Sequence, residues 1–210
     1  MSAREGLTPG SSHLPPMPDI HTGEPRPPHA PHRGTWPAGV PDTDPAAKPE
    51  PPPGEGPVLE YFKRSHRESL LYALAGAVIL AVGGTIISRG LSWIGHWFYW
   101  ALILATALTF FVLGQVEVFA AGAQWFKFKK KWVRTYELTE VKLKARGPGW
   151  WHLVLADRHN HRVTVPLNNL VQNRELWDLV YNGILHSVHK NQVTTNRAAR
   201  KLLRLPDPAK

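Results

Sequence analysis

A run of twelve residues, AQWFKFKKKWVR (Ala123–Arg134), interleaves aromatic and basic side chains. Two kinds of partner suit such a pattern. One is a nucleic acid, whose phosphates attract the cations while its bases stack on the rings. The other is the cytoplasmic face of a membrane, where aromatic and basic side chains gather at the headgroups. The segments before the run decide between them.

Histidines offer the only other concentration of reactive side chains. His159 and His161 flank Asn160 in DRHNHR, and His152 precedes them. Three imidazoles could approach a metal ion, but no acidic cluster completes a ligand set, so we predict no metal site. The sequence contains no cysteine, no phosphate-binding glycine loop and no nucleophile elbow. We expect neither an enzyme nor a bound cofactor.

Two long uncharged segments precede the aromatic and basic run. Ser69–Ser88 and Trp97–Val116 contain 20 residues each, and a helix of about 20 residues spans a bilayer core of about 30 Å. Only the eight residues Arg89–His96 join them, which makes the helices antiparallel neighbours. The sequence therefore predicts a transmembrane hairpin with helices at about 69–88 and 97–121.

Basic residues gather outside the two ends of this predicted hairpin, while the joint contains only Arg89. The positive-inside rule then predicts a multi-pass protein of the bacterial inner (plasma) membrane with both termini in the cytoplasm. The residues assigned to anionic lipid headgroups are Lys127, Lys129, Lys130, Lys131 and Arg134. The residues assigned to the membrane interfaces are Trp93, Trp97, Trp100, Trp125 and Trp132.

Glu117 is the one acid next to a predicted span. An acid at membrane depth is a functional candidate, but Glu117 would lie about two turns from the interface, within reach of headgroups or Lys127. A transport-complex component would need several copies around Glu117. Small residues in both helices favour close packing and would also allow homo-oligomerisation.

The remaining chain divides by composition. Residues 1–57 contain sixteen of the twenty prolines and few large apolar side chains, which predicts a disordered proline-rich tail. A PxxP-like run there could instead be a ligand for a proline-reading domain. The predicted hairpin region is 58–126, a cytoplasmic module follows at 127–190, and 191–210 is a basic tail.

The module has the pattern of an antiparallel sheet with one C-terminal helix. Alternating apolar residues predict strands in WVRTYEL, VKLKAR, WWHLVLA and RVTVPL, with a tight turn or a bulge at Thr139 and Glu140 and a hairpin turn at DRHNH. An apolar stripe predicts a helix over 174–189 with Asn173 as its N-cap. The overall fold class expected is a two-helix membrane hairpin plus a small cytoplasmic α+β module.

The segment RTYELTEVKLKAR, the later TVPLNNLV and the helix after it resemble bacterial pleckstrin-homology-like (PH-like) domains over residues 130–190. The resemblance implies a seven-stranded barrel closed by a helix, of which the pattern predicts about four strands. A three-stranded sheet plus helix, as in integrase arm-binding domains, fits that count equally well and would imply DNA binding.

We therefore expect a non-catalytic, membrane-anchored scaffold or adaptor that presents its module to a protein partner or to anionic lipid. The alternative is a membrane-tethered nucleic-acid-binding protein, which the predicted hairpin disfavours. Its contacts would come from the basic tail and from Lys142, Lys144, Arg146, Arg158 and Arg162.

Overall fold

The computed structural model describes residues 14–31, 48–63, 66–115, 117–147, 149–190 and 193–206. The chain forms two compact units. One is a helical unit that includes Phe62–Phe119. The other, which we call the module, contains the described part of the N-terminal segment, residues 49–61 and the chain from Ala120 onward.

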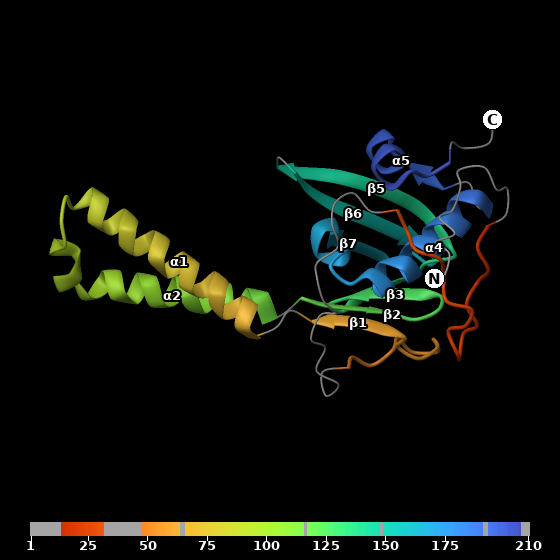
Figure 1. Cartoon of the computed structure of the whole chain (residues 1–210), viewed down its shortest axis with the longest axis horizontal. Helices are drawn as coiled ribbons and strands as arrows, with labels where there is room; N and C mark the ends of the chain where they lie inside the picture. The colour runs from red at the N-terminus through yellow and green to blue at the C-terminus, as the bar shows by residue number, and fades with distance from the viewer. Residues whose placement is uncertain are drawn as a thin grey trace, which may run out of the picture. The chain divides into compact units, whose positions relative to one another are not determined.

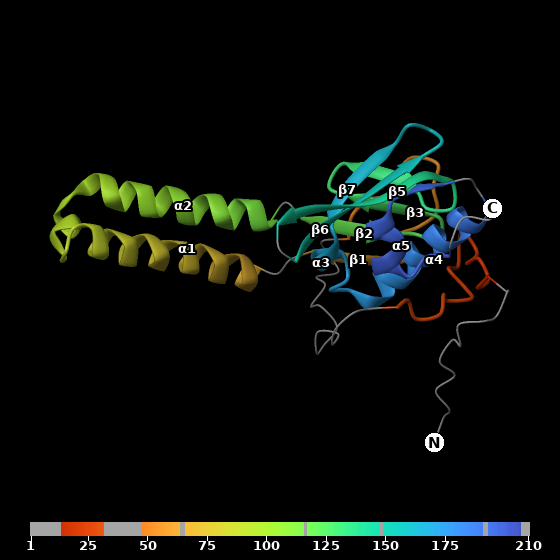
Figure 2. The same ribbon diagram turned by 90° about the horizontal axis from the view of Figure 1, so that it is seen from above.

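The helical unit is an antiparallel pair, α1 (His66–Ile87) and α2 (Trp97–Gln115), joined through the short 3-10 helix η2 (Ser92–Gly95). Figures 1 and 2 both show the two helices side by side. Gly76 permits close approach, because a Cβ there would lie 3.0 Å from the ring of Phe110. The indole N–H of Trp93 donates to Thr85 Oγ1 at 2.9 Å and ties the joint to α1.

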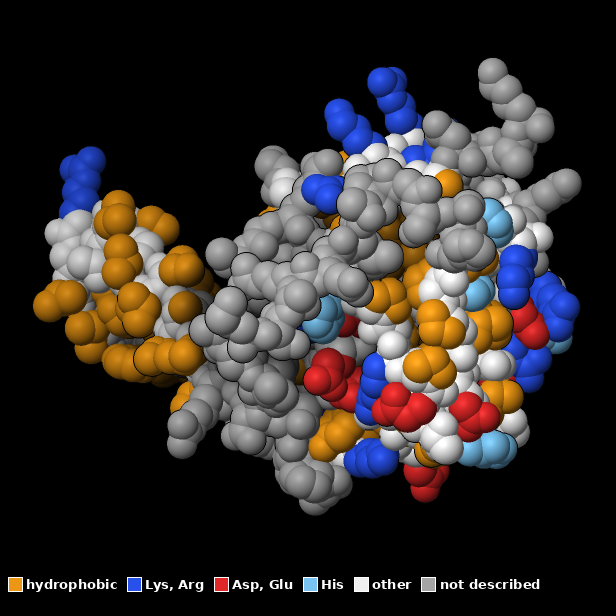
Figure 3. All heavy atoms as spheres, turned by 45° about the vertical axis from the view of Figure 1, so that its right-hand side comes forward, with side chains coloured by type: hydrophobic (Ala, Val, Ile, Leu, Met, Phe, Trp, Pro, Cys, Tyr) orange, Lys and Arg blue, Asp and Glu red, His pale blue; other side chains and the backbone are white. Residues whose placement is uncertain are grey.

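Much of the apolar surface of this helical pair is exposed, as the orange side chains of Figure 3 show. Ile79 is 70% exposed and Leu104 is also 70% exposed. By length and composition, α1 is the one described helix that could cross a membrane, through Ser69–Ile87.

The prediction of two membrane-crossing helices and a multi-pass protein is therefore wrong. The apolar part of α2, Trp97–Val112, has 16 residues, which span about 24 Å and fall short of a bilayer core of about 30 Å. The predicted continuation of this helix to residue 121 is also wrong, since Val118–Ala121 forms strand β2. Short apolar runs fit helix and strand alike, so periodicity could not separate them.

The module contains two four-stranded sheets, ordered β1-β2-β3-β4 and β7-β6-β5-β8. The strands of the first sheet are β1 (Glu60–Lys63), β2 (Val118–Ala121), β3 (Trp125–Phe128) and β4 (Lys131–Arg134). Those of the second are β5 (Leu138–Gly147), β6 (Trp150–Asp157), β7 (Arg162–Pro166) and β8 (Thr194–Thr195). The fold is thus richer than the single antiparallel sheet with one helix that the sequence pattern predicted.

The aromatic and basic run is not the exit of a helix from a membrane. It forms the antiparallel hairpin of β3 and β4, with Trp125 paired to Arg134 and Phe128 to Lys131. Trp125 is 1% exposed and lies with Val58 and Ala120 in a core cluster. The consecutive residues Trp125 and Phe126 point to opposite faces of β3 and are both buried, so protein covers both faces here and the run is not an interface belt.

The second sheet matches its predicted pattern in β5, β6 and β7, but the predicted strand WVRTYEL is divided, because β4 ends at Arg134 and β5 begins at Leu138. Val141 pairs with Leu155 and Leu143 with Leu153 in antiparallel register, and these four side chains are at most 2% exposed. The hairpin of β6 and β7 encloses the DRHNH turn as predicted. Of the two alternatives predicted at Thr139 and Glu140, the structure has the bulge, because the β5–β6 register shifts between Leu138 and Glu140 while β5 continues.

Helix α4 (Arg174–Lys190) contacts the corner where β4 passes into β5. Ser187 Oγ donates to the carbonyl of Thr135 and accepts from the N–H of Leu138, so the backbone groups freed at this corner are paired. Asn173 Oδ1 accepts from the N–H of Leu176 at 3.0 Å and caps the helix, as predicted. The short helices α3 (Leu167–Leu170) and α5 (Arg197–Leu203) flank it in sequence.

Candidate binding groove along helix α4

The N-terminal segment 14–31, which we call the strap, lies along α4 (Figure 2). This placement differs from that of a free proline-rich tail, because several strap residues contact the module through specific hydrogen bonds. Residues 48–57 contact the β3–β4 hairpin of the module: Glu55 pairs with Arg134 at 2.7 Å, and Gly56 O accepts from Trp125 Nε1 at 2.9 Å. The rest of the predicted disordered tail, 1–13 and 32–47, lies outside the described residues.

Three buried polar residues of α4 hold the strap. Asp178, Asn182 and His186 recur every four residues and therefore share one face of the helix. These three residues are 4%, 2% and 5% exposed, respectively. Asp178 Oδ1 accepts from the N–H of Ala30 at 2.8 Å, Asn182 Nδ2 donates to Pro16 O at 3.2 Å, and His186 Nε2 lies 2.6 Å from Pro15 O. We call these three residues the polar ladder.

The ladder contacts main-chain atoms of the strap, and this determines what it can recognise. Backbone carbonyls and amides are present at nearly every residue, so such contacts favour an extended conformation more than a particular side chain. Burial lowers the pKa of His186, so the ring is neutral near pH 7. Because Nε2 faces a carbonyl oxygen, it carries the ring proton.

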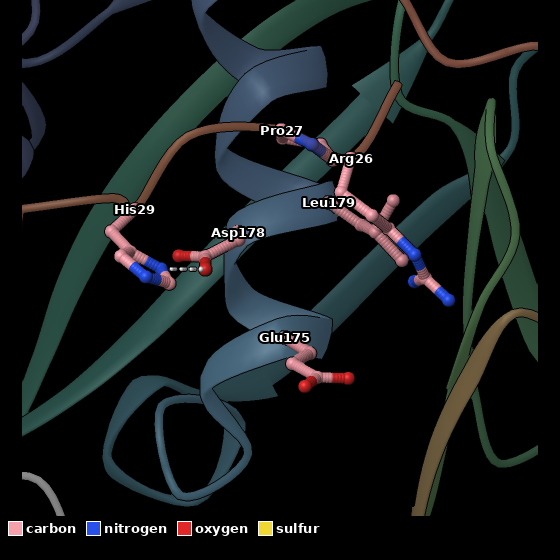
Figure 4. Close-up of a pocket in the computed structure, with 6 residues that line it drawn as sticks. All are labelled: Arg26, Pro27, His29, Glu175, Asp178 and Leu179. Carbon is pink, nitrogen blue, oxygen red and sulfur yellow. Dashed lines mark hydrogen bonds and ion pairs between the residues drawn. The ribbon is translucent and has the colours of Figure 1, made fainter. Parts of the chain in front are cut away.

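A pocket of about 250 Å³ opens between the strap and the N-terminal half of α4. Figure 4 shows its lining, which consists of Arg26, Pro27, His29, Glu175, Asp178 and Leu179. His29 Nδ1 lies 2.9 Å from Asp178 Oδ2 across this pocket. Burial raises the pKa of Asp178, while the Ala30 N–H and His29 oppose that rise. Acidic residues of α4 thus face basic residues of the strap.

A carboxyl pair lies beside this pocket. Burial raises the pKa of Glu60 to about 7, and a hydrogen bond with Glu175 and the charge of that neighbour add to the rise. Arg26 opposes it, because its guanidinium lies 3.0 Å from Glu60 Oε1. Two carboxyl groups this close bind one proton between them readily. Arg26 of the strap thus contacts a site whose charge changes near neutral pH.

A second pocket, of about 230 Å³, lies where the described strap ends at Pro31. It is largely apolar, with Trp151 from β6, Trp177 from α4, and Leu202 and Leu203 from α5 in its lining. Aromatic and aliphatic side chains of this kind suit proline rings. Both pockets include residues of α4 and of the strap, and we call the two pockets together with the polar ladder the α4 groove.

The predicted headgroup residues lie in the β3–β4 hairpin, and they divide into two sets. Lys129, Lys130 and Lys131 are exposed. Lys127 donates to the carbonyl of Glu50 at 2.9 Å, and Arg134 is paired with Glu55. Only the three lysines at the turn therefore present unshielded ammonium groups to a surface.

The predicted interface tryptophans are also divided. Trp97 and Trp100 are 79% and 52% exposed, whereas Trp93 packs within the helical unit. In the module, Trp125 is buried and Trp132 is half-buried against His161, with ring centroids 4.3 Å apart. Trp125 is thus a core residue.

The other singled-out residues belong mostly to ion pairs or turns. Glu117 directly precedes β2 and lies outside α2. His159 contacts Glu137 and His161 contacts Asp157, and the described residues contain no group of three ligands that could hold a metal ion. Among the residues considered for nucleic acid, Lys142 and Arg162 pair with Glu140, and Arg158 pairs with Glu137.

Sequence reasoning missed the α4 groove because the strap was interpreted as free. One signal was present: Asp178, Asn182 and His186 repeat at helical spacing beside the apolar stripe of α4. A polar ladder next to a buried stripe indicates a second layer of chain over the helix. Nothing in the spacing identified residues 15–30 as that layer.

Comparison of the chain with protein-family models, with curated proteins and with solved structures gives no match. The function must therefore be inferred from the geometry of the chain itself.

Proposed function

We propose that this protein is a non-catalytic adaptor, attached to a membrane through α1, whose module binds a peptide segment of a protein partner in the α4 groove. The observation that carries the proposal is the polar ladder. Three buried side chains of one helix face contact main-chain atoms of the proline-containing strap, at Pro15, Pro16 and Ala30, on either side of its turn at residues 19–24. The strap is the intramolecular occupant of the groove.

Membrane attachment is supported by α1 and by the exposed apolar surface of both helices. A contiguous apolar surface of this extent is costly in water and indicates a membrane or a protein interface. Lys129, Lys130 and Lys131 would add an attraction to anionic headgroups.

A PH-like module is supported by the strand count. The resemblance in residues 130–190 implies seven strands before a closing helix, and in the described chain β1 to β7 precede α4. Three of these strands, β1, β2 and β3, lie outside residues 130–190, the region that carried the resemblance. Such a scaffold suits presentation of a binding surface.

Peptide binding in trans tests the proposal. A fluorescent synthetic peptide of residues 14–31 is titrated into the detergent-solubilised chain, with and without deletion of residues 1–31. A tethered strap competes at an effective concentration on the order of millimolar. The deleted chain should therefore bind the peptide at least tenfold more tightly than the full chain does.

Point variants control for folding. In the deleted chain, Asn182→Ala should weaken peptide binding about tenfold, whereas His189→Ala, at an exposed position of the same helix, should leave it unchanged. Circular dichroism checks that each variant is folded. If the deleted chain does not fold, Arg26→Ala with His29→Ala in the full chain replaces it. Equal, non-saturable binding by all variants would contradict the proposal.

A further inference from the structure

The last part of the strap, residues 26–31, is buried with a period of three residues. Its burial repeats as exposed, buried and half-buried in the order Arg26, Pro27, Pro28, His29, Ala30, Pro31. A polyproline II helix has three residues per turn, and three of these six residues are prolines, whose φ is fixed near the value of that helix. The pattern indicates that residues 26–31 present one face of a polyproline-type helix, with Pro27 and Ala30, to the module.

Ala30 determines one requirement of the groove. Its N–H donates to Asp178 Oδ1 at 2.8 Å, and the two residues are 7% and 4% exposed. A proline at this position would remove the donor and leave a buried carboxylate oxygen without its hydrogen bond. A large side chain would displace the residues that bury the methyl group. The groove thus requires a small residue other than proline here.

Arg26 determines a second requirement, which is a positive charge. Its Nη1 lies 3.0 Å from Glu60 Oε1 of β1, and Glu60 is hydrogen-bonded to Glu175 of α4. The contact with Glu60 uses one guanidinium nitrogen, so it requires a cation but not the planar fork of arginine. His29 also faces an acid, Asp178, as Figure 4 shows, but its side chain is 67% exposed and water screens the contact.

We infer that the α4 groove selects, in its partner protein, a basic proline-rich segment in the polyproline II conformation. This segment has arginine or lysine at the position of Arg26, proline at that of Pro27 and a small residue other than proline at that of Ala30. The strap resembles such a segment and occupies its place until the partner binds. This inference rests on the proposed function, because it names the partner chemistry of the same groove. Charge complementarity between the acids of the module and the cation of the ligand carries it.

Peptide titration into the detergent-solubilised full chain tests the inference. The chain carries Arg26→Ala and His29→Ala, which weaken the strap and leave the β1 and α4 residues of the groove unchanged. Five fluorescent peptides of residues 14–31 are compared: the natural sequence, Arg26→Lys, Arg26→Glu, Ala30→Leu, and one with N-methylalanine, which has no N–H, at position 30. The lysine peptide should bind within about threefold of the natural one, and the other three about tenfold more weakly.

Glu60→Gln in the same chain separates charge recognition from general attraction. It removes the carboxylate that Arg26 contacts, so the penalty of the Arg26→Glu peptide should fall from about tenfold to about threefold. Glu137→Gln is the matched control, because it removes a carboxylate that pairs with Arg158 instead, and it should leave the penalty unchanged. Circular dichroism checks that both variants are folded.

The outcomes separate this inference from the proposed function. If none of the peptides binds, the proposed function itself fails. If all five bind equally, or if Glu60→Gln leaves the penalty unchanged, the groove holds a peptide without selecting these residues and only the further inference fails. If the unaltered chain dimerises in detergent and Arg26→Glu abolishes the dimer, the occupant is the strap of a second copy, which also overturns the inference.

Discussion

The side-chain amide of Asn182 donates to the carbonyl oxygen of Pro16 at 3.2 Å, across 166 positions of the sequence. This contact joins the N-terminal strap to the last long helix of the module. Because the donor is buried and its acceptor is a main-chain atom, the contact depends on the course of the strap and not on a particular side chain. The α4 groove and its proposed role both follow from this relationship.

The carboxyl pair beneath Arg26 predicts a pH dependence. The folded chain holds the pKa of Glu60 at about 7, above its usual 4.5, through burial and the neighbouring Glu175. The folded state therefore binds more protons than the unfolded state between these values, so this pair makes the free energy of unfolding fall as pH rises from about 4.5 to 7.

Glu60→Gln isolates that effect. Between pH 5 and pH 8, the wild type should lose roughly 1 kcal/mol relative to the variant, after allowance for solvent screening. This difference corresponds to about 2–4 °C in Tm. His186, whose pKa is lowered by burial, acts with the opposite sign and is common to both proteins. Parallel Tm curves across this range would contradict the prediction.

Trp125 should behave as a core residue. Trp125→Phe removes the indole N–H that donates to Gly56 O and leaves a smaller ring at a position 1% exposed. We expect a loss of about 2 kcal/mol in the free energy of unfolding of the module, measured by denaturant titration. Trp150→Phe, at a position 60% exposed, should change it by less than about 0.5 kcal/mol. Equal losses of unfolding free energy in the two variants would contradict the assignment of Trp125 to the core.

A charge in the middle of α1 tests membrane attachment. Ile79 is 70% exposed, and a lysine near the centre of a membrane-inserted helix costs about 2.5–3.5 kcal/mol. Ile79→Lys should release a large fraction of the chain from membranes washed with alkaline carbonate, whereas Ile79→Ala should not. Retention of both variants, with α1 still helical, would indicate that α1 contacts protein and not lipid.

The turn of the β3–β4 hairpin should attract anionic lipid. Lys129, Lys130 and Lys131 are exposed, and each ammonium near a membrane surface contributes about 1 kcal/mol. Replacing the three with glutamine should lower the ratio of anionic to zwitterionic lipid that co-purifies with the chain several-fold. Replacing Lys144, Arg146 and Arg197 removes the same charge elsewhere and should have little effect. Similar losses in both variants would show only a general charge effect.

Some of this fold could be predicted because its signals are local. The apolar alternation of β5, β6 and β7 gave the inner face that Val141, Leu153 and Val163 form, and Asn173 identified the start of α4. The first sheet could not be predicted in this way. Its strands are four residues each, and at that length a strand and a helical turn share the same apolar pattern.

The groove depended on contacts that no local pattern encodes. Composition alone predicts that residues 14–31 lack enough apolar surface to fold, yet they are held by polar groups that α4 already provides. Asp178 and His186 were visible in the sequence, but their partners lie 148 and 171 positions away. The C-terminal end of α2 is a further example: the helix ends at Gln115 and β2 begins at Val118, a boundary that the local pattern did not indicate.

One measurement tests the central claim most directly. The chain has no cysteine, so Met17→Cys with Lys190→Cys introduces a unique pair where Lys190 Nζ lies 3.9 Å from Met17 Sδ. In membranes, a short bifunctional thiol reagent should join the pair efficiently in the full chain. An excess of the synthetic peptide of residues 14–31 should suppress the crosslink, and Asn182→Ala should lower its yield. A crosslink that never forms, or one that saturating peptide leaves unchanged, would contradict a displaceable strap in the α4 groove.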